Sequence, residues 1–135
     1  MARRRPAPFG LAIGLAVGLV AGCAGQAVRT VEISAHYSRF VPAEITVSAG
    51  VPVTISLRNE DPIDHEWIIG DDEVHEFHRT GTELIHGDRP TEVPLPALAT
   101  RTTTLTFDQP GRLLFICHLP GHEAYGMVGV LNVVP

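Results

Sequence analysis

Short runs in which apolar and polar residues alternate make up much of the chain, and glycine and proline turns separate them. In the first run, Val31, Ile33 and Ala35 fall on one side of an extended backbone. The same period of two returns at 45–47 and at 53–58, and no helical period of useful length interrupts it. Such alternation is typical of strands with one buried face. We therefore predict an all-β fold, a sandwich or a barrel.

The stretch 112–117 differs from these runs because it is apolar on both sides. Leu113, Phe115 and Cys117 share one face, and the two residues between them share the other. A strand that is apolar on both faces is covered on both faces. We expect this strand to bring Cys117 into a dry, packed place, and a last strand over 128–134 to close the sheet.

The loop that follows carries three kinds of metal ligand. Cys117, His122 and Met127 offer a thiolate, an imidazole and a thioether, with four residues between each pair. A metal that accepts all three is soft or borderline, and two imidazoles, one thiolate and a weak thioether are the ligands of an electron-transfer copper site. Zinc fits less well, because it has no use for a thioether. The alternative is a buried free cysteine and a core methionine, which are both common.

The loop supplies one imidazole, so a copper site needs a second from elsewhere. His65 stands where a polar turn meets an apolar strand, at the end of a sandwich rather than in its middle. A histidine in such a place is ordinarily a solvent-facing loop residue, but the ligands of the loop make His65 our candidate. Trp67, two residues further along the strand, has the same facing and is expected to pack beneath it.

The beginning of the chain is typical of an export signal. Three arginines precede an apolar stretch over 9–22 that is too short to span a bilayer comfortably. Small residues then lead up to Cys23, as in a bacterial lipobox. We predict a lipoprotein signal over 1–22, a lipidated Cys23 with a short tether over 23–29, and one domain over 30–135. An ordinary signal peptide that contains a cysteine is the alternative.

Charge and cysteine content narrow the function further. Without the three leader arginines, seven basic residues remain against fifteen acidic ones, so a nucleic acid is not an expected partner. If Cys23 carries lipid, Cys117 is the remaining thiol in an oxidising compartment and has no partner for an internal disulfide. Metal ligation would protect that thiol from oxidation.

The alternation stops between Asp71 and Thr91, in an acidic stretch that contains three histidines and two glycines. We expect a loop over 71–92. Its histidines are a possible second metal site, because His75 and His78 are three residues apart and would share a helical face, with His86 nearby. The alternative is a solvated acidic loop whose histidines touch nothing. His36 is expected on the surface.

Taken in order, these features resemble the cupredoxins, the small blue copper proteins that include plastocyanin, pseudoazurin and amicyanin. The resemblance covers residues 30–135. It rests on Phe-Val-Pro at 40–42, the strand at 45–47 before Gly50, the Asn59 turn that leads to His65, and the final Cys-x4-His-x4-Met loop.

The resemblance implies a Greek-key sandwich of seven or eight strands and one type 1 copper ion. It implies that His65, Cys117 and His122 ligate the copper, with Met127 as a weak axial ligand. It also implies that the edge of His122 is the port for electrons. Glycine before His122 and before Met127 allows the backbone angles of such a tight loop.

Two residues depart from the family pattern. Many cupredoxins have Asn after the first ligand histidine, where this chain has Glu66, so the rigidity of the two ligand loops and the reduction potential are open. His118 follows Cys117 as in multicopper oxidases and nitrite reductases, but Ile116 occupies the other flank, so a trinuclear centre is not encoded.

The sequence favours an electron-transfer protein over an enzyme. The leading hypothesis is a one-electron carrier, lipid-anchored on the outer side of a bacterial cell membrane, that serves a cytochrome, an oxidase or a reductase. The alternative is a protein for copper capture, delivery or resistance, and an interaction module ranks last. We expect a monomer without a further catalytic domain.

Overall fold

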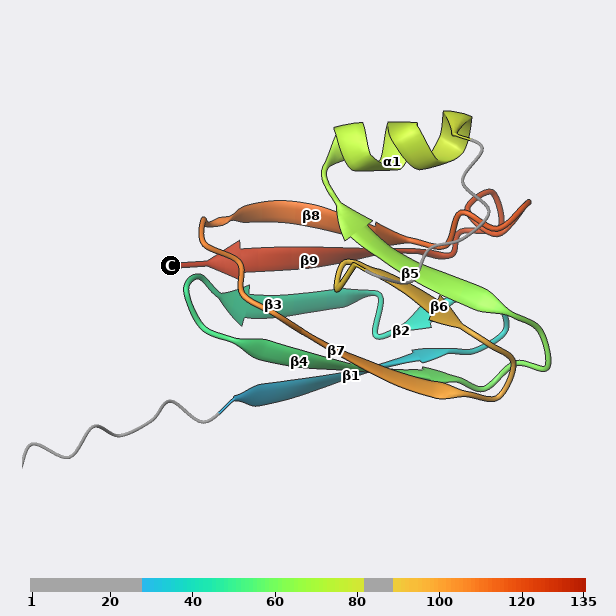
Figure 1. The fold of residues 1–135 in the computed structure, drawn as a ribbon, viewed down its shortest axis with the longest axis horizontal. Coiled ribbons are helices and arrows are strands. Elements are labelled where there is room, and N and C mark those ends of the chain that lie inside the picture. The colour runs from blue at the N-terminus through green and yellow to red at the C-terminus, as the bar shows by residue number, and fades with distance from the viewer. Residues whose placement is uncertain (1–27, 82–88) are drawn as a thin grey trace, which may run out of the picture.

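The computed structural model describes residues 28–81 and 89–135, which form a sandwich of two β-sheets with one helix on its outside (Figure 1). The predicted signal, Cys23 and His86 lie outside the described residues. The strands are β1 (Arg29–Ala35), β2 (Phe40–Val41), β3 (Glu44–Ser48), β4 (Val53–Asn59), β5 (His65–Gly70), β6 (Glu92–Leu95), β7 (Thr100–Leu105), β8 (Gly111–Ile116) and β9 (Val128–Val134), and the helix is α1 (Asp72–Thr80).

The strand order confirms the predicted all-β sandwich. One sheet has the order β2-β1-β4-β7 and the other β3-β9-β8-β5-β6. The β1–β4 and β3–β9 pairs are parallel, and the other pairs are antiparallel. The described residues contain nine strands rather than seven or eight, and β2 has only two residues. The last strand does not lie at an edge, because β9 is inserted between β3 and β8.

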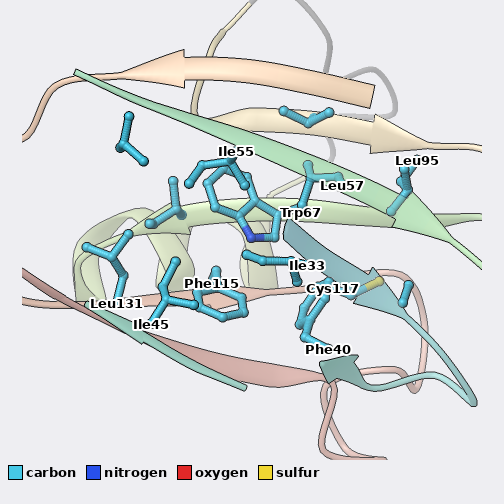
Figure 2. Close-up of a cluster of buried hydrophobic side chains, with 14 of the residues drawn as sticks. Ile33, Phe40, Ile45, Ile55, Leu57, Trp67, Leu95, Phe115, Cys117 and Leu131 are labelled. Atoms are coloured by element: carbon cyan, nitrogen blue, oxygen red, sulfur yellow. The ribbon is translucent and has the colours of Figure 1, made fainter. Parts of the chain in front are cut away.

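The alternating residues of the strands meet between the sheets and form the core (Figure 2). Trp67 is fully buried, as predicted, and its ring centroid lies 6.0 Å from that of Phe115. Phe40 contacts the same Phe115 ring edge to face, at 5.3 Å. Burying a large apolar side chain contributes about 1.5–3 kcal/mol. Cys117 belongs to this cluster and lies at one end of it (Figure 2).

The helix α1 corrects the expectation of a loop over 71–92. Asp71 caps its first turn, where the carboxylate accepts a hydrogen bond of 3.0 Å from the Val74 N–H. Acidic residues in the first turn and basic ones in the last also favour the helix dipole. Among the described residues, no helix is long and apolar enough to cross a membrane.

The helix covers the outer face of the five-stranded sheet, beside β5 and β8 (Figure 1). A Cβ atom at Gly70 would lie 2.6 Å from the Val74 Cβ, so the glycine permits this close packing. His75 is fully buried on the same side. The hypothesis of a solvated loop whose histidines touch nothing is therefore wrong for His75 and His78, and the helix explains why β8 is apolar on both faces.

Candidate metal centre

Three of the four predicted ligands converge at one end of the sandwich. Ligand atoms of His65, Cys117 and His122 all lie within 4.8 Å of one another. The Nδ1 atoms of the two imidazoles are 3.1 Å apart, and the Cys117 Sγ lies 3.2 Å from the His122 Nδ1. His65 begins β5, Cys117 directly follows β8, and His122 comes from the loop before β9. The strand order thus brings together residues that are more than fifty positions apart.

Backbone hydrogen bonds hold the ligand loop closed. The Cys117 N–H donates to the Met127 carbonyl at 3.2 Å, and the Met127 N–H donates to the His122 carbonyl at 3.0 Å. Gly121 and Gly126 have φ angles of +86° and +88°, where a side chain would be strained. Met127 is fully buried. Its role as the axial ligand stays a prediction.

Asp61 orients His65, and the sequence analysis missed it. The His65 Nε2 lies 2.9 Å from the Asp61 Oδ2. Because a carboxylate only accepts, the His65 proton sits on Nε2 and the lone pair of Nδ1 faces His122 and Cys117. The backbone N–H groups of Tyr37 and Ser38 each donate to Asp61 at 2.8 Å. An aspartate four residues before a candidate ligand was the available signal.

The same contacts set the charge of Asp61. Burial by itself would raise the pKa of this carboxyl, but the Ser38 and Tyr37 backbone N–H groups and the His65 ring together hold its pKa below the usual value. Asp61 is therefore an anion at neutral pH. Its negative charge lies next to the place where the imidazoles would hold a cation.

The chemistry of the other two residues also fits a metal ion. Burial raises the pKa of Cys117 to about 11, although the backbone N–H groups of Glu66 and Leu119 act in the opposite direction. Burial, and then the neighbouring His65, lower the pKa of His122, which keeps the imidazole neutral. A buried thiolate needs a cation beside it, and neutral imidazoles have lone pairs to donate. The set of two nitrogens and one sulfur fits copper.

Glu66 ties the two ligand segments together. Its Oε1 accepts a hydrogen bond of 2.8 Å from the backbone N–H of His118, and the carboxyl is almost fully buried. This bond joins β5, which starts with His65, to the segment that starts with Cys117. Although Glu66 stands where many cupredoxins have Asn, the two ligand segments remain connected. The Glu66 carboxylate also lies beside the Cys117 thiol.

The ligands differ in their access to solvent. His65, Cys117 and Met127 are buried, whereas His122 is partly exposed. Pro120, Ala124 and Tyr125, which are close to His122 in the sequence, are exposed. An electron or a small ion would reach the centre most directly along the His122 ring.

Two of the predicted secondary residues, His75 and His78, lie on the other side of the five-stranded sheet, and His86 lies outside the described residues. His75 and His78 belong to α1 and are buried. The Nδ1 of His75 faces His118, which the sequence analysis did not include in this group. His36 is on the surface, as expected, and pairs with Glu60. A role of His75, His78 and His86 in binding metal stays a prediction.

Comparisons with known proteins agree with this geometry. The family model of the cupredoxin-like domain matches residues 10–130. The chain is 32% identical over 144 residues to the copper-resistant cuproprotein CopI of Pseudomonas aeruginosa, with 83% of this chain and 80% of the relative covered. It is 34% identical over 117 residues to CopI of Rubrivivax gelatinosus, with 83% and 70% covered.

A solved structure shares the fold. The dithionite-reduced auracyanin of the photosynthetic bacterium Roseiflexus castenholzii superposes with a TM-score of 0.67 at 27% identity. The alignment covers 81% of this chain and 99% of that one. By the match over most of its length, by its fold and by its relatives, this chain belongs to the cupredoxin-like family.

Proposed function

We propose that this protein is a copper-resistance cupredoxin that binds one copper ion in a type 1 site. His65, Cys117 and His122 are its strong ligands, and Met127 is its weak axial ligand. The observation that carries this proposal is the meeting of two imidazole nitrogens and one thiol sulfur in a single place at the end of the core. Copper bound there is held by a thiolate and is kept away from other cell components.

Two observations support resistance over the other functions of the fold. Both CopI relatives are named for copper resistance, and the alignments cover most of this chain and of theirs. The site itself is deep, since Cys117 is fully buried and His65 nearly so. A buried thiolate releases copper slowly, which suits a protein that sequesters the ion.

A second candidate is the one-electron carrier, and the exposure of His122 favours it. This ligand alone among the four is partly exposed, so it offers a short path to a redox partner. A likeness of 27% identity to a "blue" copper protein, auracyanin A of Chloroflexus aurantiacus, adds support. Bound copper supplies the Cu(II)/Cu(I) couple, and the protein performs no bond chemistry on a substrate.

We propose the location of the protein from the sequence features of the leader. Export through a lipoprotein signal, with lipid on Cys23, would place the domain outside the cytoplasm and at the membrane surface. A resistance protein there would meet copper before the cytoplasm does. Labelled-lipid incorporation at Cys23, compared with Cys23→Ala, tests the anchor, and an unlabelled chain with Cys23 intact would contradict it.

Copper tolerance in cells distinguishes the two candidates. A strain that lacks the protein should lose tolerance to added copper, and the native chain should restore it. Cys117→Ala should not restore it, whereas His36→Ala, a matched surface control, should. If the strain tolerates copper normally but respires or grows poorly without added copper, the carrier function replaces resistance.

A further inference from the structure

The end of α1 is joined to the loop that carries His122. Arg79 belongs to the last turn of the helix, and Glu123 directly follows His122 in the sequence. The side chains of Arg79 and Glu123 form an ion pair although they are 44 positions apart. Figure 1 shows this end of the helix next to the loop that precedes β9. The helix therefore has a direct connection to a predicted copper ligand.

The two side chains contact each other through several atoms. The Arg79 Nη2 donates to the Glu123 Oε1 at 2.7 Å, and the Arg79 Nε lies 3.1 Å from both carboxylate oxygens. A planar guanidinium can hold both oxygens of a carboxylate at once, whereas a lysine ammonium acts as a point charge. The contact with Arg79 therefore fixes the orientation of Glu123 as well as its distance from the helix.

The helix orders Arg79 before it reaches the loop. The Glu76 Oε2 lies 3.6 Å from the Arg79 Nη1, one turn earlier in α1. The side chains of Arg79 and Glu123 are 39% and 32% exposed. Exposed ion pairs generally contribute little, in part because two long side chains lose their freedom. Glu76 already restricts Arg79, so less freedom is lost when Arg79 binds Glu123.

The loop around His122 depends on contacts from outside. Its own backbone hydrogen bonds are short in range, since the Tyr125 N–H donates to the Gly121 carbonyl at 3.0 Å and the Gly126 N–H donates to the Glu123 carbonyl at 2.8 Å. Glycine at each end of the segment allows its backbone to rotate. The segment 121–126 can therefore move as a unit unless other segments hold it.

A second arginine reaches the same loop with a weaker contact. The Arg39 Nη1 donates to the Gly126 carbonyl at 3.4 Å. This is one long hydrogen bond to a neutral oxygen. Hydrogen bonds between a guanidinium and a carboxylate are shorter and stronger. Arg79 is therefore the stronger of the two contacts.

Movement of this loop gives the most direct route by which copper could enter or leave. His65, Cys117 and Met127 are buried, whereas His122 is partly exposed. The ligand that faces solvent is thus carried by the loop that Arg79 holds. If this contact breaks, His122 can swing outward while the buried ligands stay in place.

We propose that Arg79 is a positioning residue for the copper centre, which holds His122 in place through Glu123 and thereby slows both the entry and the release of copper. Neither Arg79 nor Glu123 is a ligand, so their ion pair forms in the loaded and in the empty chain alike. It therefore changes both rates by the same factor and leaves the affinity unchanged. This inference rests on the proposed copper site and assigns α1 a role in it.

Transfer of copper to a chelator, followed by stopped flow, tests the proposal on the complete chain. Arg79→Ala should bind and release copper about two- to fivefold faster than the native chain, as expected for the loss of an exposed ion pair, with equal affinity. Arg79→Lys keeps the charge without the planar group, so its rates should lie between the two. Native rates in Arg79→Ala, or an altered affinity with a native release rate, would overturn the proposal.

Two further variants separate the ion pair from the loss of a positive charge. Arg112→Ala removes an exposed arginine of β8 and should keep the native rates. Faster release in this control would show that charge alone is responsible. The double variant Arg79→Ala, Glu123→Ala should be no faster than either single variant, because both changes remove the same contact. If the two effects multiply instead, the residues act independently and the proposal is wrong.

Hydrogen exchange in the copper-free chain gives a readout that does not depend on copper. The amides of Tyr125 and Gly126 should exchange about two- to fivefold faster in Arg79→Ala, and the amide of Leu131 in β9 should not change. Unchanged exchange at Tyr125 and Gly126, or equal acceleration at Leu131, would overturn the role of Arg79. A native chain that binds no copper would instead contradict the proposed function, so the two failures are distinguishable.

Discussion

The two histidine pairs lie on opposite faces of the same sheet, and adjacent residues supply one member of each group. Cys117 points into the sandwich toward His65 and His122, whereas His118 lies under α1 beside His75. Neighbouring residues of an extended chain point to opposite faces. One short segment after β8 therefore presents Cys117 to the candidate metal centre and His118 to the histidine cluster under α1.

The difference between the two clusters lies in their sulfur. The first centre combines two imidazoles with the Cys117 thiol, and the second cluster contains only nitrogen donors from His75 and His118. A thiolate favours soft ions and provides strong coupling for electrons, and imidazoles alone favour borderline ions. The predictions below address the properties in which the two clusters should differ.

The pH dependence of copper affinity should differ most. Burial raises the pKa of Cys117 to about 11 in the copper-free protein, so copper must displace this proton at neutral pH. Affinity of the first centre should rise about tenfold per pH unit, or roughly a thousandfold from pH 7 to 10, and fall equally as the pH decreases. Competition titrations with a chelator measure this slope.

The Cys117→Ala chain is the control for this slope. It keeps the nitrogen ligands and has no buried thiol to deprotonate, so its affinity should vary much less over the same range. A flat profile in the native chain would mean that the thiol does not ligate copper.

Asp61→Ala should weaken copper binding at the first centre by about 10–100-fold, the usual cost of losing a group that orients a ligand. His65 would lose the partner that keeps its proton on Nε2. Asp64→Ala is the matched control, because Asp64 caps the Ala97 N–H instead. Chelator competition measures both, and equal affinities would show that Asp61 does not orient His65.

A fall in pH should weaken the contact between Asp61 and His65. The pKa of Asp61 is lowered in the folded protein, so its contribution to stability is present above the pKa of the unfolded chain and is lost as the pH falls through the folded value.

Gly70→Ala should disturb the second cluster and spare the first. The new Cβ would lie 2.6 Å from the Val74 Cβ, so α1 must move outward. We expect a loss of about 1–3 kcal/mol in the free energy of unfolding, with copper affinity at the first centre unchanged. A Cβ atom at Gly111 would have no heavy atom within 4 Å, so Gly111→Ala is the control and should leave the free energy of unfolding unchanged. Chemical denaturation measures the stability and chelator competition measures the copper affinity, and a stability equal to that of the native chain would contradict this close packing of α1.

Glu66→Gln should have the smallest effect. The amide oxygen can still accept the His118 N–H, but the negative charge beside Cys117 is lost. That charge favours Cu(II) over Cu(I), so the reduction potential should rise when the charge is removed. The rise should be less than about 59 mV, the value that corresponds to a tenfold change in the equilibrium constant of a one-electron couple. Voltammetry measures the shift, and a lower potential would contradict this role of Glu66.

The sequence predicted the parts whose signals are local. Alternation located most strands, and the spacing of Cys117, His122 and Met127 within one loop identified the ligand segment. His65 was identified because the loop needs a second imidazole and His65 stands where a polar turn meets an apolar strand, and the family resemblance implied the same ligand. The strand order then explains why it meets the loop.

The missed features depend on contacts between distant segments. Asp61 is held by the turn at 37–38, more than twenty residues earlier, and His75 meets His118 across 43 positions. The helix was missed because it is short and its buried residue is a histidine rather than an apolar one. Asp71, a standard capping residue, was the signal that could have located it.

The most direct test of the copper centre is the visible spectrum of the copper-loaded native chain beside that of Cys117→Ala. We predict an intense sulfur-to-copper charge-transfer band in the native chain and none in the variant. A colourless native copper complex, or an intense band that survives in Cys117→Ala, would contradict ligation by His65, Cys117 and His122.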